Sequence, residues 1–224
     1  MKAQLIKLTQ AAVLGGLTLL AMPASAYQAG DLILRAGAAG VLPTGDGTHP
    51  AAAGPNVEAG DGWSLGLTAT WMATNNIGVG VLAAWPFEHD IETKGGLAGT
   101  GDAGEIKHLP PTVTLQYHFN TTSKLHPYIG AGINYTNFFS EDINPGNTVL
   151  GPAVGSLKLD DSWGLALEIG ADYELQNNWL VSAQVWYVDI DTDATISGYG
   201  DARDASFNVE IDPWVVMLGV GKKF

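Results

Sequence analysis

The sequence predicts an all-β fold: an eight-stranded antiparallel transmembrane β-barrel of the outer membrane, with short periplasmic turns and long extracellular loops. Three observations predict it. Eight segments alternate apolar and polar residues with the two-residue period of a strand, their connections are alternately long and short, and their apolar faces begin and end on aromatic residues. A soluble sandwich gives no reason for this alternation of connection lengths, whereas a membrane barrel requires it.

The predicted strands differ in how clearly their two faces separate. The sharpest alternation lies at 163–174, where an apolar face opposes one that carries Glu168, Asp172 and Glu174. The eight predicted strands are 31–42, 63–72, 77–87, 112–119, 128–138, 163–174, 179–188 and 214–224. The long connections are 44–62, 88–109, 140–161 and 189–212, and the short turns are 73–76, 120–124 and 176–178.

The last predicted strand, 214–224, has an almost wholly apolar face with an aromatic residue at each end, and the sequence stops at Phe224 with no segment left to cover it. Taken alone, this strand would also suit a soluble sandwich. The paired aromatics decide between the two folds. Eight to ten tilted residues span about 20 to 25 Å along the membrane normal, which is close to the apolar band of a barrel between its two aromatic belts.

Residues 1–26 are predicted to be a signal peptide. Lys2 and Lys7 provide a charged start, an apolar run follows at 8–22, and small residues lead to a cleavage site after Ala26. A transmembrane helix is the competing interpretation, but the apolar run is short and no basic stop-transfer segment follows it. We therefore expect a single barrel domain at 27–224, located in the outer membrane of a Gram-negative cell.

The charge balance excludes some partners. The chain of 224 residues has 10 basic and 23 acidic residues, and removing Lys2 and Lys7 leaves 8 basic residues against 23 acidic ones. Nucleic acid is not expected as a partner, because binding to phosphates rests on clustered Lys and Arg. The chain has no cysteine and therefore no disulfide framework.

No pattern in the sequence predicts an enzyme, a cofactor or a metal site. There is no Gly-rich phosphate loop after a strand, no metal-spaced His cluster, and no arrangement of Ser, His and carboxylate that spacing supports. Only His118 is expected in the lumen, while His49, His89, His108 and His126 are expected in loops or at a turn. The acidic run Asp189, Asp191 and Asp193 fits either a divalent-cation site or a solvated loop.

The inward-facing residues predict a lumen with two layers. Charged residues fall in the periplasmic half, at Arg35, Glu168, Asp172 and Glu174, together with Gln116, His118, Gln184 and Lys223. Apolar residues fall at mid-height or above, at Leu82, Ala84, Phe138, Trp186, Val188, Val215 and Met217. We expect an ionic floor below an apolar chamber. Because buried charges must be paired, we expect Arg35 to bridge Glu168 or Asp172.

An apolar chamber above a polar floor suits a channel for passive uptake of small hydrophobic molecules, since a porin would keep polar residues along the whole pore. Leu82 and Trp186 are the candidates for a constriction, although the same residues would also serve simply to pack a solid barrel. The alternative function is a structural or receptor barrel with a closed lumen, whose surface loops mediate attachment.

Three prolines bear on how a solute would leave. Pro86, Pro110 and Pro111 each remove a hydrogen-bond donor from neighbouring strands. The prolines predict either a lateral opening toward the outer leaflet or two strands that merely end at the rim.

Several segments together resemble the outer-membrane protein W (OmpW) family, which includes the alkane-import protein AlkL. They are ATNNIGV (73–79), HLPPT (108–112), PYIGAGINYTNFF (127–139), NNWLVSAQVWYVDIDT (177–192) and DPWVVMLGVGKKF (212–224). The resemblance implies an eight-stranded barrel with a hydrophobic channel lined by residues that include Leu82 and Trp186. The expected partners are outer-membrane lipid and lipopolysaccharide, small hydrophobic solutes and the barrel-assembly machinery. Lys222 departs from the family, which usually has an aromatic residue there, and the connection 44–62 matches no motif that would indicate the solute.

Overall fold

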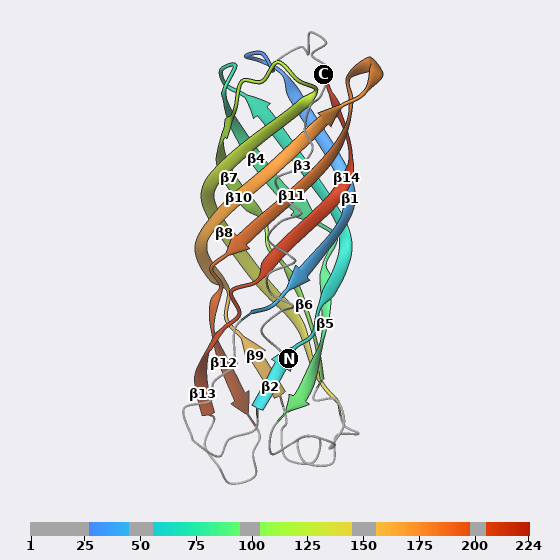
Figure 1. Cartoon of the computed structure of the whole chain (residues 1–224). Coiled ribbons are helices and arrows are strands. Elements are labelled where there is room, and N and C mark those ends of the chain that lie inside the picture. The colour runs from blue at the N-terminus through green and yellow to red at the C-terminus, as the bar shows by residue number, and fades with distance from the viewer. Residues whose placement is uncertain (1–26, 45–55, 95–103, 145–155, 198–204) are drawn as a thin grey trace, which may run out of the picture.

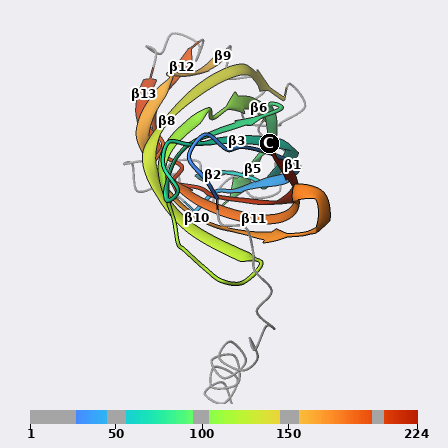
Figure 2. The ribbon, with the colours of Figure 1, turned by 90° about the horizontal axis from the view of Figure 1, so that it is seen from above.

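Eight antiparallel strands close into a barrel in the computed structural model, which describes residues 27–44, 56–94, 104–144, 156–197 and 205–224 (Figure 1). The wall consists of β1 (Leu32–Leu42), β3 (Gly62–Met72), β4 (Ile77–Ala84), β7 (Thr112–His118), β8 (Leu125–Ile143), β10 (Ser162–Glu174), β11 (Trp179–Val188) and β14 (Trp214–Lys223). Their order is β10-β11-β14-β1-β3-β4-β7-β8, and β8 pairs with β10 to close the ring (Figure 2). The predicted fold is confirmed.

The first and last strands complete the wall. In the β1–β14 ladder Ile33 lies opposite Lys223, and at its end the backbone N–H of Phe224 donates to the carbonyl oxygen of Leu32 over 2.8 Å. The neighbouring Lys222, on the outer side, places its Nζ 5.4 Å from the ring centre of Trp179. The closing strand therefore ends beside the short turns, at the periplasmic end of the barrel (Figure 1).

The four long connections contain further strands beyond the eight that were predicted. They contain β2 (Asn56–Ala59), β5 (Phe87–Lys94), β6 (Gly104–Leu109), β9 (Ser156–Leu159), β12 (Asp191–Ser197) and β13 (Ala205–Glu210). The first three continue the wall beside β8, and the last three form a separate sheet in the order β13-β12-β9 at the same end of the barrel (Figure 1). These strands are rich in polar residues, so the apolar alternation that identifies a strand in sequence is weak in them.

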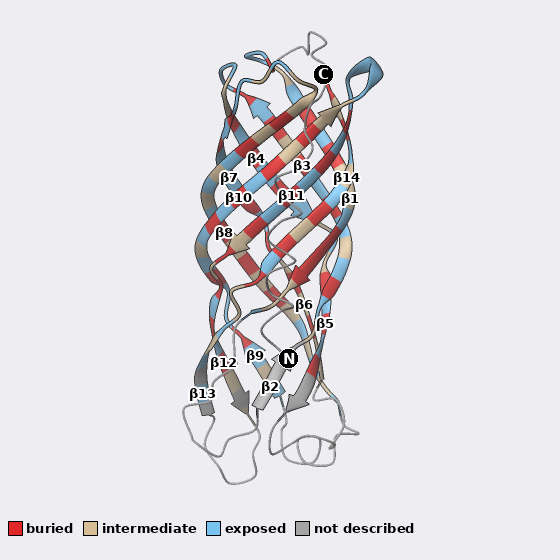
Figure 3. Cartoon of the chain, viewed as in Figure 1, coloured by how far each residue is buried: buried red, intermediate tan, exposed pale blue. Residues whose placement is uncertain are grey.

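Apolar side chains cover the outside of the wall, as predicted. Trp163 is 71% exposed and Leu165 67% exposed, and the buried and exposed residues alternate along each strand (Figure 3). Exposed aromatics lie at both edges of this band, with Trp63, Trp85, Trp163 and Trp214 near the extensions and Trp71, Trp179 and Phe224 near the short turns. Such a surface is stable only in lipid. No helix among the described residues is long and apolar enough to cross a membrane.

One predicted strand ends earlier than expected. The prediction placed 77–87 in one strand with Phe87 facing lipid, but β4 ends at Ala84 and β5 begins at Phe87. Phe87 is turned inward and is only 1% exposed. On one side of the break, the N–H of Trp85 still donates to the carbonyl oxygen of Leu65 over 2.9 Å, which ties the segment to β3. Pro86 lies within it, where it has no N–H to continue a ladder.

Candidate functional site in the barrel lumen

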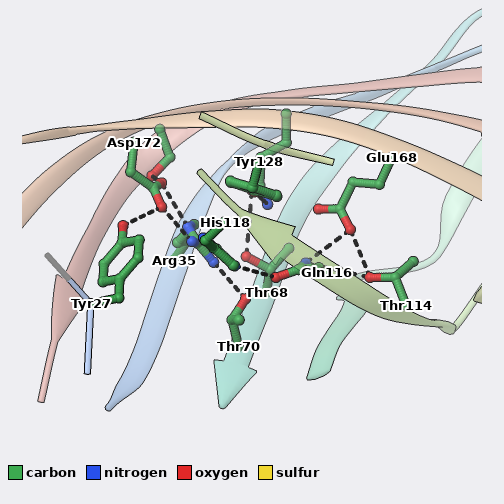
Figure 4. Close-up of polar contacts among 12 residues, drawn as sticks. Tyr27, Arg35, Thr68, Thr70, Thr114, Gln116, His118, Tyr128, Glu168 and Asp172 are labelled. Carbon is green, nitrogen blue, oxygen red and sulfur yellow. Dashed lines mark hydrogen bonds and ion pairs between the residues drawn. The ribbon is translucent and has the colours of Figure 1, made fainter. Parts of the chain in front are cut away.

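A buried ion pair forms the lower layer of the lumen. The Nε of Arg35 donates to Oδ1 of Asp172 over 2.9 Å, and its Nη1 donates to Oγ1 of Thr70 over 2.9 Å. Asp172 also accepts from the hydroxyls of Tyr27 and Ser182, at 2.6 and 2.5 Å (Figure 4). Neither charged side chain is exposed to solvent. The two charges are therefore paired and hydrogen-bonded, which is the condition under which buried charge is tolerated.

The partner of Arg35 is Asp172 rather than Glu168, the other candidate from the sequence. Glu168 instead accepts through Oε2 from Oγ1 of Thr114, at 2.7 Å, and from Nε2 of Gln116, at 2.9 Å (Figure 4). Glu174 lies lower, with its Oε2 3.3 Å from Nε2 of His126. The floor thus has an ion pair at its centre and a second carboxylate beside it.

Two tyrosines complete the floor. Tyr27 precedes β1, and its ring lies 5.1 Å from that of His118. Sequence reasoning missed it because Tyr27 belongs to no alternating segment. Tyr128 is buried, and its ring lies 5.5 Å from the Arg35 guanidinium carbon. A side chain at Gly170 would clash with it, since a Cβ there would lie 2.3 Å from the ring.

The apolar chamber begins directly above these polar groups. Across the ladders, Trp186 lies opposite Glu168, Met217 opposite Gln184, and Leu82 opposite Thr68. Opposed residues of a ladder share a face, so the polar-to-apolar boundary follows neighbouring strands around the lumen. Of the predicted chamber residues, Leu82, Phe138, Trp186, Val188, Val215 and Met217 are buried in one cluster, and Ala84 is partly buried against it. Their roles in transport stay predictions.

A narrow pocket lies at the extracellular end of this chamber, near the strands β5 and β6. Its volume is about 10 Å³, roughly room for one water molecule. Its walls are apolar except for His89 and His108, and the other lining residues are Val41, Pro43, Ile106, Phe138, Ile190, Ile211 and Pro213. A solute of several carbon atoms therefore enters only if these side chains move.

The two histidines of the pocket correct a prediction. His89 and His108 were expected in loops, but both are buried, and their Nε2 atoms are 2.9 Å apart. The break at Pro86 causes this, because β5 begins and β6 ends there, which places Phe87 opposite His108. His126 was also expected at a turn and is buried in β8, while His49 lies outside the described residues.

Burial changes the protonation of this pair, which lies beyond the outer aromatic belt. It lowers the pKa of His108 to about 3 and, less strongly, that of His89. Nδ1 of His89 is 2.6 Å from the carbonyl oxygen of Gly60. A glycine is required at 62, since a Cβ there would lie 2.5 Å from the His89 ring. Both imidazoles are therefore neutral at pH 7.

All three prolines lie at one interruption in the wall. The β4–β7 ladder ends at Leu82 opposite Thr112, and the β5–β6 ladder resumes at Phe87 opposite His108. Between them, 83–86 and 109–111 form no ladder with each other, and these segments contain Pro86, Pro110 and Pro111. The structure places the predicted residues together, and whether the interruption opens stays a prediction.

No group of three or more metal-binding side chains occurs within the described parts of the chain. Asp191 and Asp193 lie in β12 with their side chains exposed.

A family model described as the OmpW family matches residues 28–224. The chain belongs to the OmpW family. It is 47% identical over 204 residues to outer membrane protein W of Vibrio cholerae serotype O1, a match that covers 90% of this chain and 92% of that protein. The crystal structure of the outer membrane protein OprG from Pseudomonas aeruginosa is similar, with a TM-score of 0.78 and 41% identity, and covers 88% of this chain and 97% of that one.

Outer membrane protein AlkL of Ectopseudomonas oleovorans is a more distant relative, 28% identical over 83% of this chain and 75% of its own length. Together with the lipid-facing wall, membership of the OmpW family makes this chain an outer-membrane protein of a Gram-negative cell. Both the resemblance and the location inferred from the sequence are confirmed.

Proposed function

We propose that this barrel is a channel for passive uptake of small hydrophobic molecules, which enter the apolar chamber from outside and leave sideways into the membrane. One observation carries the proposal: the apolar cluster around Trp186 stands directly on a floor in which Arg35 and Asp172 form a buried ion pair and Glu168 is held by hydrogen bonds from Thr114 and Gln116. The chain is a distant relative of AlkL, which supports the proposal. So does the hydrophobic channel that the resemblance to the OmpW family implies.

The floor favours a lateral exit over a vertical one. A hydrophobic solute that passed straight down would separate Arg35 from Asp172 and offer neither a replacement hydrogen bond. Each buried polar group left unpaired costs about 1 to 3 kcal/mol, and charged groups cost more. The ladder interruption at Pro86 requires no such loss, because its backbone groups are not joined across the gap.

The test is uptake by whole cells with and without this protein, comparing octane with maltose. We expect the protein to speed octane entry and to leave maltose entry unchanged, since a sugar would lose its hydration in the apolar chamber. Equal acceleration of both solutes, or of neither, would rule out the hydrophobic channel.

The prolines provide a more specific prediction. Changing both Pro86→Ala and Pro110→Ala restores two backbone donors at the interruption, so the ladder can continue and octane uptake should slow severalfold. Pro127→Ala, in β8 near the periplasmic end, is the matched control and should leave uptake unchanged. If the double variant takes up octane as fast as the wild type, the exit does not lie at this interruption.

A second candidate is a closed structural barrel whose extracellular extensions mediate attachment. The tight packing of the chamber favours it, because the pocket holds roughly one water. The octane assay separates the two, since a closed barrel leaves octane entry unchanged. Contacts with lipopolysaccharide and with the barrel-assembly machinery stay predictions under either function.

A further inference from the structure

The histidine pair of the pocket is a directed hydrogen bond rather than a face-to-face stack. The ring centroids of His89 and His108 are 4.9 Å apart, their planes are inclined by 21°, and their Nε2 atoms are 2.9 Å apart. A separation between the nitrogens that is 2 Å shorter than that between the centroids means that the rings meet edge to edge. One ring therefore donates an N–H to the other.

The direction of this bond follows from the backbone. The carbonyl oxygen of Gly60 can only accept, so Nδ1 of His89 is the donor across their 2.6 Å contact. A neutral imidazole has one N–H, and Nε2 of His89 is consequently an acceptor. The donor between the rings is then Nε2 of His108, which leaves Nδ1 of His108 with a lone pair and no proton. The lowered pKa values of both histidines keep this arrangement at neutral pH.

That lone pair has no hydrogen-bond partner within the described part of the chain. His108 is 5% exposed, and its Nδ1 makes no hydrogen bond to any described residue. The ring lies between those of Phe87 and Phe138, with centroids 5.7 and 5.9 Å away, and neither offers a polar atom. An acceptor buried in this way is costly unless something donates to it.

A water molecule satisfies this acceptor poorly. Buried waters need two to four polar partners. Both ring nitrogens of His89 are already engaged, so Nδ1 of His108 is the one unused side-chain polar atom among the residues that line the pocket. A solute hydroxyl differs from water because its apolar body is held by Ile106 and the other pocket walls, and it needs only this one acceptor.

We propose that Nδ1 of His108 is a specificity-determining acceptor that selects hydrophobic solutes carrying one hydroxyl or comparable N–H or O–H donor over solutes that have none. The inference rests on the proposed channel and deepens it. His108 lies at the outer edge of the ladder interruption, opposite Phe87, so a solute bound to it is positioned beside the proposed exit.

The test measures binding of 2-naphthol and 2-methoxynaphthalene to the folded full-length barrel. Both are apolar and aromatic, and only 2-naphthol can donate. We expect 2-naphthol to bind about tenfold more tightly, the effect of one hydrogen bond. His108→Gln keeps a donor toward His89 but has no acceptor at the position of Nδ1. The ratio of the affinities for 2-naphthol and 2-methoxynaphthalene should therefore fall to near one. His108→Asn retains an oxygen near the position of Nδ1 and should keep most of the preference.

A second measurement needs no variant. In ¹⁵N-histidine-labelled wild type, the Nδ1 resonance of His108 should move upfield on addition of 2-naphthol and stay in place with 2-methoxynaphthalene. Equal binding of the two probes, an unchanged preference in His108→Gln, or an unmoved Nδ1 resonance overturns the proposal. Uptake of the same probes separates it from the channel. Selective binding without uptake removes the transport function alone, whereas fast but unselective uptake removes the role of His108 alone.

Discussion

Arg35→Ala is expected to destabilise the barrel by about 3 to 5 kcal/mol, because it leaves Asp172 charged and buried with hydroxyl partners only. The free energy of unfolding in lipid vesicles, followed by tryptophan fluorescence against urea, measures the effect. Conductance across planar bilayers should rise in parallel, because the change removes a large side chain from the buried floor.

Two controls define this result. Lys222→Ala removes a cation of the neighbouring strand β14 that lies over the rings of Trp179 and Phe224, and it should cost less than about 1 kcal/mol. The double change Arg35→Met with Asp172→Leu removes both charges together, so it should recover most of the stability lost in Arg35→Ala. An Arg35→Ala barrel no less stable than Lys222→Ala would contradict the structural role of the ion pair.

The combined change Leu82→Ala with Trp186→Ala is expected to increase octane uptake severalfold, because it removes the two bulkiest predicted side chains at the lower boundary of the chamber. The cavity should also lower stability, by about 2 to 5 kcal/mol for Leu82 and about 3 to 5 kcal/mol for Trp186 if each is changed alone. Whole-cell octane uptake, normalised to the amount of folded protein, is the measurement.

The matched control changes the outside of the wall instead. Leu165→Ala with Trp163→Ala removes the same two residue types from the lipid face of β10, and it should leave octane uptake unchanged. Octane uptake and conductance that stay at wild-type values in the Leu82 and Trp186 variant would show that these side chains pack the lumen without restricting passage.

The wall of the barrel could be predicted from sequence because lipid is its solvent on one side. Every second residue must be apolar where a strand crosses, so the signal lies within each segment and needs no knowledge of neighbouring strands. The same alternation predicted an inward direction for Arg35, Glu168 and Asp172, all three of which are buried. It left the partner of Arg35 open, since that depends on which strands face each other across the barrel.

The residues missed by the sequence analysis share one cause, which is that their positions depend on contacts between distant segments. Tyr27 reaches the floor through Asp172, 145 positions away. His89 and His108 face inward because the break at Pro86 ends β4 and a new ladder begins with Phe87. The polar strand β12 is identified only by its pairing with β13 and β9.

The sequence by itself therefore determined the barrel and its membrane location, because both rest on the local two-residue period of a strand in lipid. Only the tertiary structure decided that Arg35 pairs with Asp172, that the prolines meet at one interruption, and that His108 presents to the chamber an acceptor that no described residue satisfies. Those features depend on strand register across the closed barrel, which no single segment encodes.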